Sequence, residues 1–233
     1  MAQPVAPQSR RPASTPDSDD LVLARALEFS AWARRHARII IVVALVAAVV
    51  LGGLIIQRTR EANRAEQAAA EFMQLEQSVL VLGDPNVAST DLQRFIERFD
   101  GTTYADEARV LLGRIQLQAN QPQAAIPPLQ EASRRIGRTP VAAQAGLLLG
   151  AAYEQAENPQ AAIETYLQVG RDSRSDFERQ QALAAAAALR QQTGDPAGAV
   201  ELYRQLVGMT EEGSFDRTVY EMRLAEAEAL ARQ

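Results

Sequence analysis

The chain has 233 residues and a formal charge of −5 at pH 7, and all 24 of its basic residues are arginine. It contains no cysteine, one histidine and only 5% aromatic residues. The lack of cysteine excludes disulfides, thiolate metal sites, cysteine nucleophiles and a lipid-bearing cysteine. An alanine-rich, aromatic-poor composition indicates an all-α protein.

The N-terminal region divides into a polar tail and a short helix. Residues 1–18 consist largely of Pro, Ser, Ala and Gln without an apolar pattern, which predicts a disordered tail. Residues 19–38 predict a juxtamembrane helix that Asp19 or Asp20 could cap.

Residues 39–56 are eighteen consecutive apolar residues without a charge. As a helix they would be roughly 27 Å long, which favours an uncleaved transmembrane span over a core helix or a signal peptide. Four nearby arginines precede the segment and three follow it. Together with the family resemblance described below, this bias favours a cytoplasmic N-terminus and an extracytoplasmic C-terminal domain.

The remainder, residues 57–233, repeats itself every 37 residues. The repeat is marked by a proline that follows Asp, Gln or Asn and precedes an alanine by three positions. Asp and Asn are good N-caps, and proline fits the first position of a helix. The four prolines therefore begin helices rather than break them: Pro85, Pro122, Pro159 and Pro196.

Each of these helices pairs with one that starts earlier in the same repeat. The first helices are expected at about 104–119, 140–156 and 176–193, with caps at Thr103, Thr139 and Ser175. In the first repeat, the apolar face from Ala65 to Leu82 plays the same part. The second helices are expected at about 85–99, 122–136, 159–171 and 196–209. Pro127 and Pro128 predict a kink or restart in the second of these. A charged helix at about 216–232 would cap the array, which gives an all-α solenoid of about four hairpins.

The third repeat resembles a tetratricopeptide repeat. That motif joins Leu and Gly, a Tyr three positions on, an Ala and a later aromatic residue. The residues that carry the resemblance are Leu149, Gly150, Tyr153, Ala162 and Tyr166, and the fourth repeat keeps Ala199 and Tyr203. The motif's tryptophan is missing throughout, and the step is 37 residues rather than 34.

The whole layout is similar to the bacterial ancillary Sec translocon subunit family, above all at residues 99–130, where a Phe-x-x-x-x-Tyr-Ala stretch leads into a hairpin. That resemblance would cover about residues 20–230. It implies an inner-membrane protein with a periplasmic repeat domain that associates with the export channel and with periplasmic chaperones.

No catalytic, metal or cofactor motif is present, and His36 is the only histidine. We therefore expect no enzyme and no cofactor. Nucleic acid is disfavoured because residues 57–233 hold 18 arginines against 25 acidic residues, a net charge of −7.

The candidate site is a protein-binding groove on the first helices, carried over from the tetratricopeptide resemblance. It is rich in amides and nearly uncharged, so a clamp for a peptide carboxylate is not expected. Its residues are Glu107, Arg114, Gln118, Gln144, Glu154, Gln155, Gln181, Gln191 and Gln192. The sequence thus predicts a membrane-anchored adaptor. The alternatives are a division or envelope scaffold, or a structural spacer that self-associates through its span, for which Gly52 and Gly53 could allow close helix packing.

Overall fold

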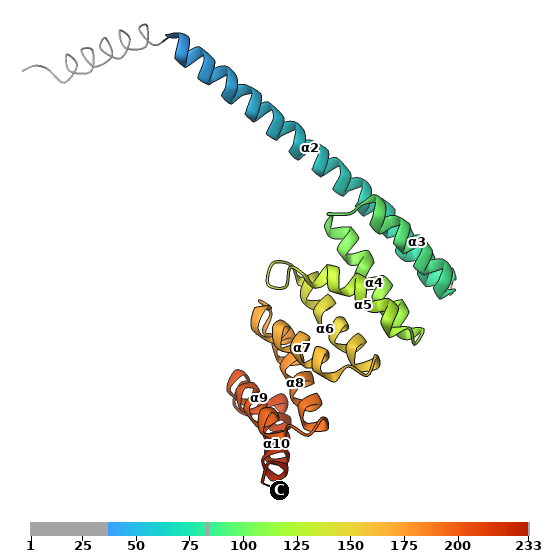
Figure 1. The fold of residues 1–233 in the computed structure, drawn as a ribbon, viewed down its shortest axis with the longest axis vertical. Helices are drawn as coiled ribbons and strands as arrows, with labels where there is room; N and C mark the ends of the chain where they lie inside the picture. The colour runs from blue at the N-terminus through green and yellow to red at the C-terminus, as the bar shows by residue number, and fades with distance from the viewer. Residues whose placement is uncertain (1–36, 83, 233) are drawn as a thin grey trace, which may run out of the picture. The chain divides into compact units, whose positions relative to one another are not determined.

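A computed structural model of the chain describes residues 37–82 and 84–232, and the regular structure in these ranges is entirely helical (Figure 1). The predicted tail at residues 1–18, most of the predicted juxtamembrane helix and His36 lie outside the described residues.

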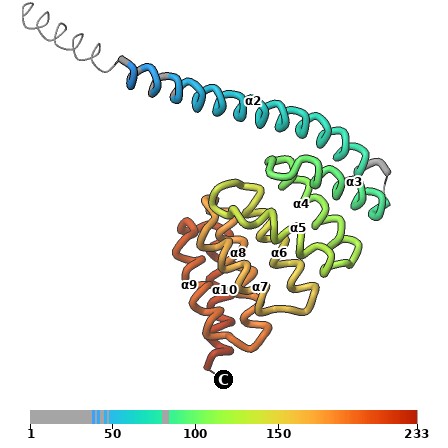
Figure 2. The backbone as a smooth tube through the Cα atoms, turned by 45° about the horizontal axis from the view of Figure 1, so that its top comes forward, coloured from blue at the N-terminus to red at the C-terminus, as the bar shows by residue number. Residues whose placement is uncertain are grey.

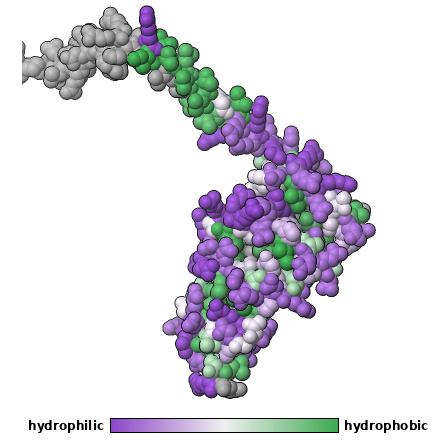
Figure 3. Space-filling model, viewed as in Figure 1, coloured by the Kyte–Doolittle hydropathy of each residue, from purple (hydrophilic) through white to green (hydrophobic). Residues whose placement is uncertain are grey.

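The chain divides into two units, residues 1–60 and residues 61–233. Helix α2 (Ala37–Leu82) begins in the first unit. There the large apolar side chains that the structure describes are exposed, for example Ile39 at 62% and Ile56 at 55%, and they form the green band of Figure 3.

Within the described part of the chain, no helix meets the length and apolarity that a membrane crossing requires. The span expected at residues 39–56 includes Ile40, Val43, Ala44 and Ala47, whose side chains lie outside that part, and the span stays a prediction.

The second unit is a row of helical hairpins (Figure 2). We call α2, α4, α6, α8 and α10 the first helices and α3, α5, α7 and α9 the second helices. The bounds are α3 (Pro85–Arg98), α4 (Thr103–Gln118), α5 (Pro122–Ser133), α6 (Pro140–Gln155), α7 (Pro159–Asp172), α8 (Asp176–Gln192), α9 (Pro196–Met209) and α10 (Phe215–Leu230). Apart from the end of α5, they agree with the predicted bounds to within about two residues.

The helix starts follow the predicted capping chemistry. The side chains of Asp84, Asn158 and Asp195 each accept a hydrogen bond from a backbone N–H of the following first turn, whereas Gln121 does not. One prediction was wrong: the cap of α4 is Thr102, which accepts from the Ala105 N–H, rather than Thr103. Asp106, the acid three residues after Thr103 that suggested a capping box there, instead pairs with Arg109 and Arg135.

The predicted restart at Pro127 and Pro128 does not occur, because α5 runs without interruption from Pro122 to Ser133. The two prolines deprive the carbonyls of Gln123 and Ala124 of their helical donors. Both of these residues are exposed, so water can satisfy their carbonyls. The helix ends three residues earlier than predicted.

The first helices α4, α6 and α8 end in the same way, 37 residues apart. Asn120, Glu157 and Gly194 adopt positive φ angles of 56°, 55° and 86°. The residue after each, the cap of the next helix, donates its N–H back to Gln116, Tyr153 or Arg190. This is the Schellman arrangement, and it turns the chain directly from a first helix into a second helix.

Neighbouring first helices lie closer together than neighbouring second helices. Helix α4 packs along α6, and α6 touches α8, whereas α5 and α7, or α7 and α9, do not pack directly on each other. The row therefore curves with its first helices inside. We call the exposed side chains of α4, α6 and α8 on that side the inner face.

The core lies between the stacked hairpins. Large buried side chains recur in it at one register position, where Leu92, Leu129, Tyr166 and Tyr203 are all at most 5% exposed. Burying one such side chain contributes about 1.5–3 kcal/mol. The residues that define the repeat thus hold neighbouring hairpins together.

Candidate functional site

The nine predicted groove residues all lie on the first helices, and none is fully buried. Helix α4 carries Glu107, Arg114 and Gln118; α6 carries Gln144, Glu154 and Gln155; and α8 carries Gln181, Gln191 and Gln192. All nine thus lie on the first helices, and their role as a groove stays a prediction.

The charged members of this set have different environments. Burial and the nearby carboxylate of Glu76 raise the pKa of Glu107. Arg114 has neither an ion pair nor a hydrogen bond to its side chain among the described residues. The inner face therefore offers one available cation and several amides, a surface suited to uncharged polar groups.

Glu154 has a structural partner. Its carboxylate accepts a hydrogen bond from the hydroxyl of Tyr166 at 2.5 Å. Burial and this carboxylate raise the pKa of Tyr166 far above its usual value, so the phenol remains the donor. Glu154 consequently fixes the packing of α7 on α6 and is less available to a ligand than its exposure suggests.

The repeat-defining residues pack hairpin against hairpin. Tyr166 and Leu149 are 5% exposed, and Ala162 and Ala199 are completely buried. Gly150 lies against the ring of Tyr166, where an added Cβ would overlap the ring carbons. Tyr203 is buried, and Tyr153 is half-buried. Pro85, Pro122, Pro159 and Pro196 each begin a second helix.

A pocket of about 510 Å³ opens between α8 and α10, and we call it the α8–α10 pocket. Among the predicted residues, the structure brings Gln191 and Gln192 together there. Their neighbours are Ala184 and Ala188 of α8, Tyr203 of α9, and Val219, Tyr220, Arg223, Glu226 and Leu230 of α10. Sequence reasoning missed the five residues of α10, because it treated that helix only as a solvent-facing cap.

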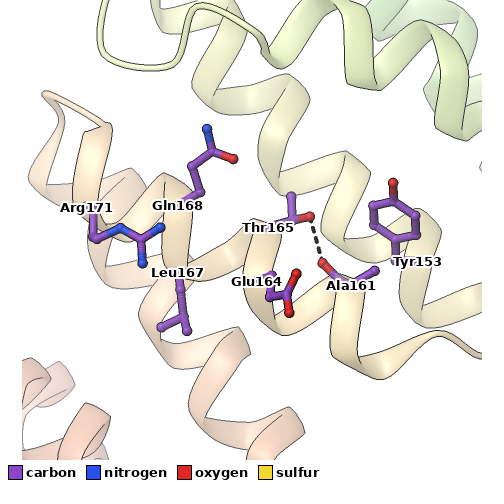
Figure 4. A pocket seen from close by; sticks show the side chains of 7 residues that line it. All are labelled: Tyr153, Ala161, Glu164, Thr165, Leu167, Gln168 and Arg171. Carbon is purple, nitrogen blue, oxygen red and sulfur yellow. Dashed lines mark hydrogen bonds between the residues drawn. The ribbon is translucent and has the colours of Figure 1, made fainter.

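A second pocket, of about 420 Å³, lies between α6 and α7 away from the predicted set (Figure 4). Tyr153 stands at one side of it, and Gln168 and Arg171 stand at the other. Thr165 donates its hydroxyl to the carbonyl of Ala161 at 2.7 Å and is thereby used within its own helix. None of the predicted groove residues lines this pocket.

The chemistry of both pockets favours binding. In the ranges that the structure describes, no group of three or more His, Cys, Asp or Glu side chains could hold a metal ion. Their linings combine amides, hydroxyls, apolar side chains and a few charged groups, all of which can contact a polypeptide.

The curved row of helical hairpins with this lining defines an α-solenoid of the protein-interaction class. The profile of the tetratricopeptide repeat-like domain matches residues 30–173. The chain belongs to that family, whose helical repeats are typical of protein-interaction adaptors.

Solved structures share the fold at low identity. The crystal structure of MamA protein matches with a TM-score of 0.52 and 16% identity, covering 72% of this chain and 90% of that one. Pseudomonas aeruginosa pilF matches with a TM-score of 0.52 and 17% identity, covering 72% of this chain and 71% of that one. The third structure is a Podosopora anserina kinesin light chain candidate with nearly identical TPR-like repeats. It matches with a TM-score of 0.53 and 20% identity, covering 75% of this chain and 88% of that one. No curated protein matches the sequence significantly.

Proposed function

We propose that the chain is a membrane-anchored adaptor, in which residues 39–56 hold the protein to a bilayer and the inner face recruits a protein partner. The observation that carries the anchor is the exposed apolar band of α2. Among the side chains that the structure describes from Ile39 to Ile56, eleven large apolar ones are each at least 51% exposed. A contiguous apolar surface of this kind needs lipid or protein to cover it.

The recruiting role is supported by the repeat fold together with the amide-rich inner face. An anchor confines the repeats to the membrane surface, so a partner bound there reaches a higher local concentration beside any neighbouring complex. No chemical step is required of the chain itself.

The resemblance to the ancillary Sec translocon subunit family supports a specific setting. The repeats would lie on the periplasmic side of a bacterial inner membrane, and the partners would be the export channel and periplasmic chaperones. Four arginines lie close before the apolar segment (Arg25, Arg34, Arg35 and Arg38), and three lie close after it (Arg58, Arg60 and Arg64), a bias in the same direction.

Membrane extraction tests the anchor. The full chain, expressed in a bacterium with a C-terminal tag, should stay in the pellet after alkaline carbonate treatment. Replacing Val46 and Val49 with arginine should release it, because a charge within a span costs about 2.5–3.5 kcal/mol per residue. The matched control is Met73→Arg, an exposed apolar position outside the band, which should remain in the pellet. Release of the unaltered chain would contradict the anchor.

Protease protection then tests the orientation. In intact spheroplasts, added protease should remove the C-terminal tag if the repeats face the periplasm. A tag that stays protected until the membrane is opened would place the repeats in the cytoplasm, and the translocon setting would be wrong.

A further inference from the structure

The third and fourth repeats carry a tyrosine at the same register position, but the hydroxyls of the two tyrosines differ in their hydrogen bonding. In the third repeat Tyr166 donates to Glu154 at 2.5 Å. Thirty-seven residues further on, the equivalent tyrosine is Tyr203, and the position equivalent to Glu154 holds a glutamine, Gln191. Neither Tyr203 nor the side chain of Gln191 makes a hydrogen bond within the described residues.

Both of these side chains line the α8–α10 pocket. Tyr203 is only 4% exposed as a residue. Among the described residues, the only fully buried side-chain nitrogen or oxygen atom without a hydrogen-bond partner is the side-chain oxygen of Gln116. The unpartnered hydroxyl of Tyr203 is therefore not fully buried. The Tyr203 hydroxyl can therefore be reached from the pocket and can donate a hydrogen bond to a ligand there.

The pocket exists because α10 does not continue the packing of the other first helices. Helix α4 packs along α6, and α6 touches α8, but α8 and α10 hardly approach one another. The opening has apolar surfaces on both sides, with Ala184 and Ala188 on α8 facing Val219 and Leu230 on α10. Helix α10 is thus one wall of a cavity as well as the end of the array.

The charges of the pocket cancel. Arg223 and Glu226 are the charged side chains that line it, and they pair with each other at 3.1 Å. The site therefore offers no net charge to a ligand, and the amides of Gln191 and Gln192 can each donate and accept, as a peptide group does.

We propose that the α8–α10 pocket binds an uncharged peptide segment of a protein partner, with an apolar side chain between the two helices and its backbone hydrogen-bonded by Tyr203 and Gln191. This inference rests on the proposed adaptor function and assigns that function to one end of the inner face. Burial raises the pKa of Tyr203, Arg223 lowers it and Glu226 raises it, with a net upward shift, so the hydroxyl keeps its proton for donation.

The test uses the full chain in detergent micelles. Immobilised protein is exposed to a library of short peptides with acetylated N-termini and amidated C-termini, and the retained peptides are sequenced. The best binder is then synthesised, and its Kd is measured by calorimetry for the unaltered chain and for Tyr203→Phe, Gln191→Glu and Tyr166→Phe.

Gln191→Glu is the sharpest variant, because it copies the Glu154 arrangement. The new carboxylate should accept a hydrogen bond from the Tyr203 hydroxyl, which is then no longer available to a ligand. We expect retained peptides without charged residues, a Kd about five- to tenfold weaker for Tyr203→Phe, and a loss at least as large for Gln191→Glu. That variant should unfold at a temperature no lower than the unaltered chain, which shows that it folds. Tyr166→Phe should bind as before.

Equal Kd values for the unaltered chain, Tyr203→Phe and Gln191→Glu would overturn the inference, as would retained peptides that are mainly charged, or no retained peptide at all. If bulky replacements of Gln118 and Gln155 abolish binding while the two pocket variants do not, the adaptor function stands and the pocket assignment fails.

Discussion

The ring of Tyr166 lies against the bare Cα of Gly150, at a place where a Cβ would overlap the ring carbons. The same register holds Gly113 against Leu129 one repeat earlier. In these two successive repeats, a glycine on the first helix thus makes room for a large side chain of the following second helix.

Replacing Gly150 with alanine should therefore destabilise the protein by about 1–3 kcal/mol, because the added methyl group forces the Tyr166 ring to shift. Urea unfolding of the full chain in micelles measures the change. The matched control is Gly208→Ala in α9, where an added Cβ meets no atom within 4 Å. That change should be neutral or stabilising by up to about 1 kcal/mol. Equal effects at both glycines would contradict the packing role of Gly150.

Glu157 holds a backbone position that favours glycine. Its φ is 55°, and the equivalent residue of the next repeat is Gly194, with a φ of 86°. Glu157→Gly should stabilise the protein by about 0.5–1 kcal/mol, since the left-handed conformation costs an L-residue about 1–2 kcal/mol. The reciprocal change, Gly194→Ala, adds a Cβ in open space. It should destabilise by a similar amount, and a thermal unfolding series compares the two. Destabilisation by Glu157→Gly would show that its side chain matters more than its backbone.

Gln116 stands where the third repeat has Tyr153, and its side-chain oxygen is buried without a hydrogen-bond donor. Gln116→Met keeps the length of the side chain and removes this oxygen, so it should stabilise the protein by about 1 kcal/mol. Gln118→Met, two residues on and exposed, should change little. The midpoints of chemical unfolding distinguish the two variants. A loss of stability in Gln116→Met would mean that the amide has a partner that the structure does not reveal.

Asp100 makes stability depend on acidity. Its carboxylate pairs with the buried Arg109 at 2.5 Å, and that hydrogen bond holds its pKa below the usual 3.8. The pair stabilises the folded state above pH 3.8, and this contribution is lost as the pH falls through the lowered folded-state pKa. Asp100→Asn should flatten the pH dependence of unfolding in that acidic range. Asp91→Asn, in an exposed pair with Arg94, should leave the slope nearly unchanged. Parallel slopes for Asp100→Asn and the unaltered chain would contradict this account.

The helix starts could be predicted from sequence because capping is local. Asp84, Asn158 and Asp195 cap their helices with their own side chains, and the proline that follows each fixes the first turn. Where two local signals compete, as at Thr102 and Thr103, the prediction was one residue off. At Pro127 the prediction overstated the free-energy cost of a proline inside a helix. Periodicity cannot show that the two carbonyls left without donors belong to exposed residues.

The candidate site could be predicted only in part. Register places glutamines along the first helices, where the structure describes them as exposed or half-buried, and their use as a binding surface stays a prediction. The sequence register could not show that Tyr166 donates a hydrogen bond to Glu154 whereas Tyr203 makes none with Gln191. Both facts depend on side-chain geometry. The α8–α10 pocket depends on how closely two helices approach, which no residue pattern encodes directly.

The central claim is that the inner face recruits a partner, and site-specific photocrosslinking in living cells tests it most directly. A photoreactive residue replaces exposed glutamines on the first helices, Gln118 and Gln155, or exposed glutamines on the second helices, Gln130 and Gln168. The account predicts a defined crosslinked protein from Gln118 and Gln155 and none from Gln130 and Gln168. The same crosslinks from all four positions, or crosslinks only from the second helices, would contradict it.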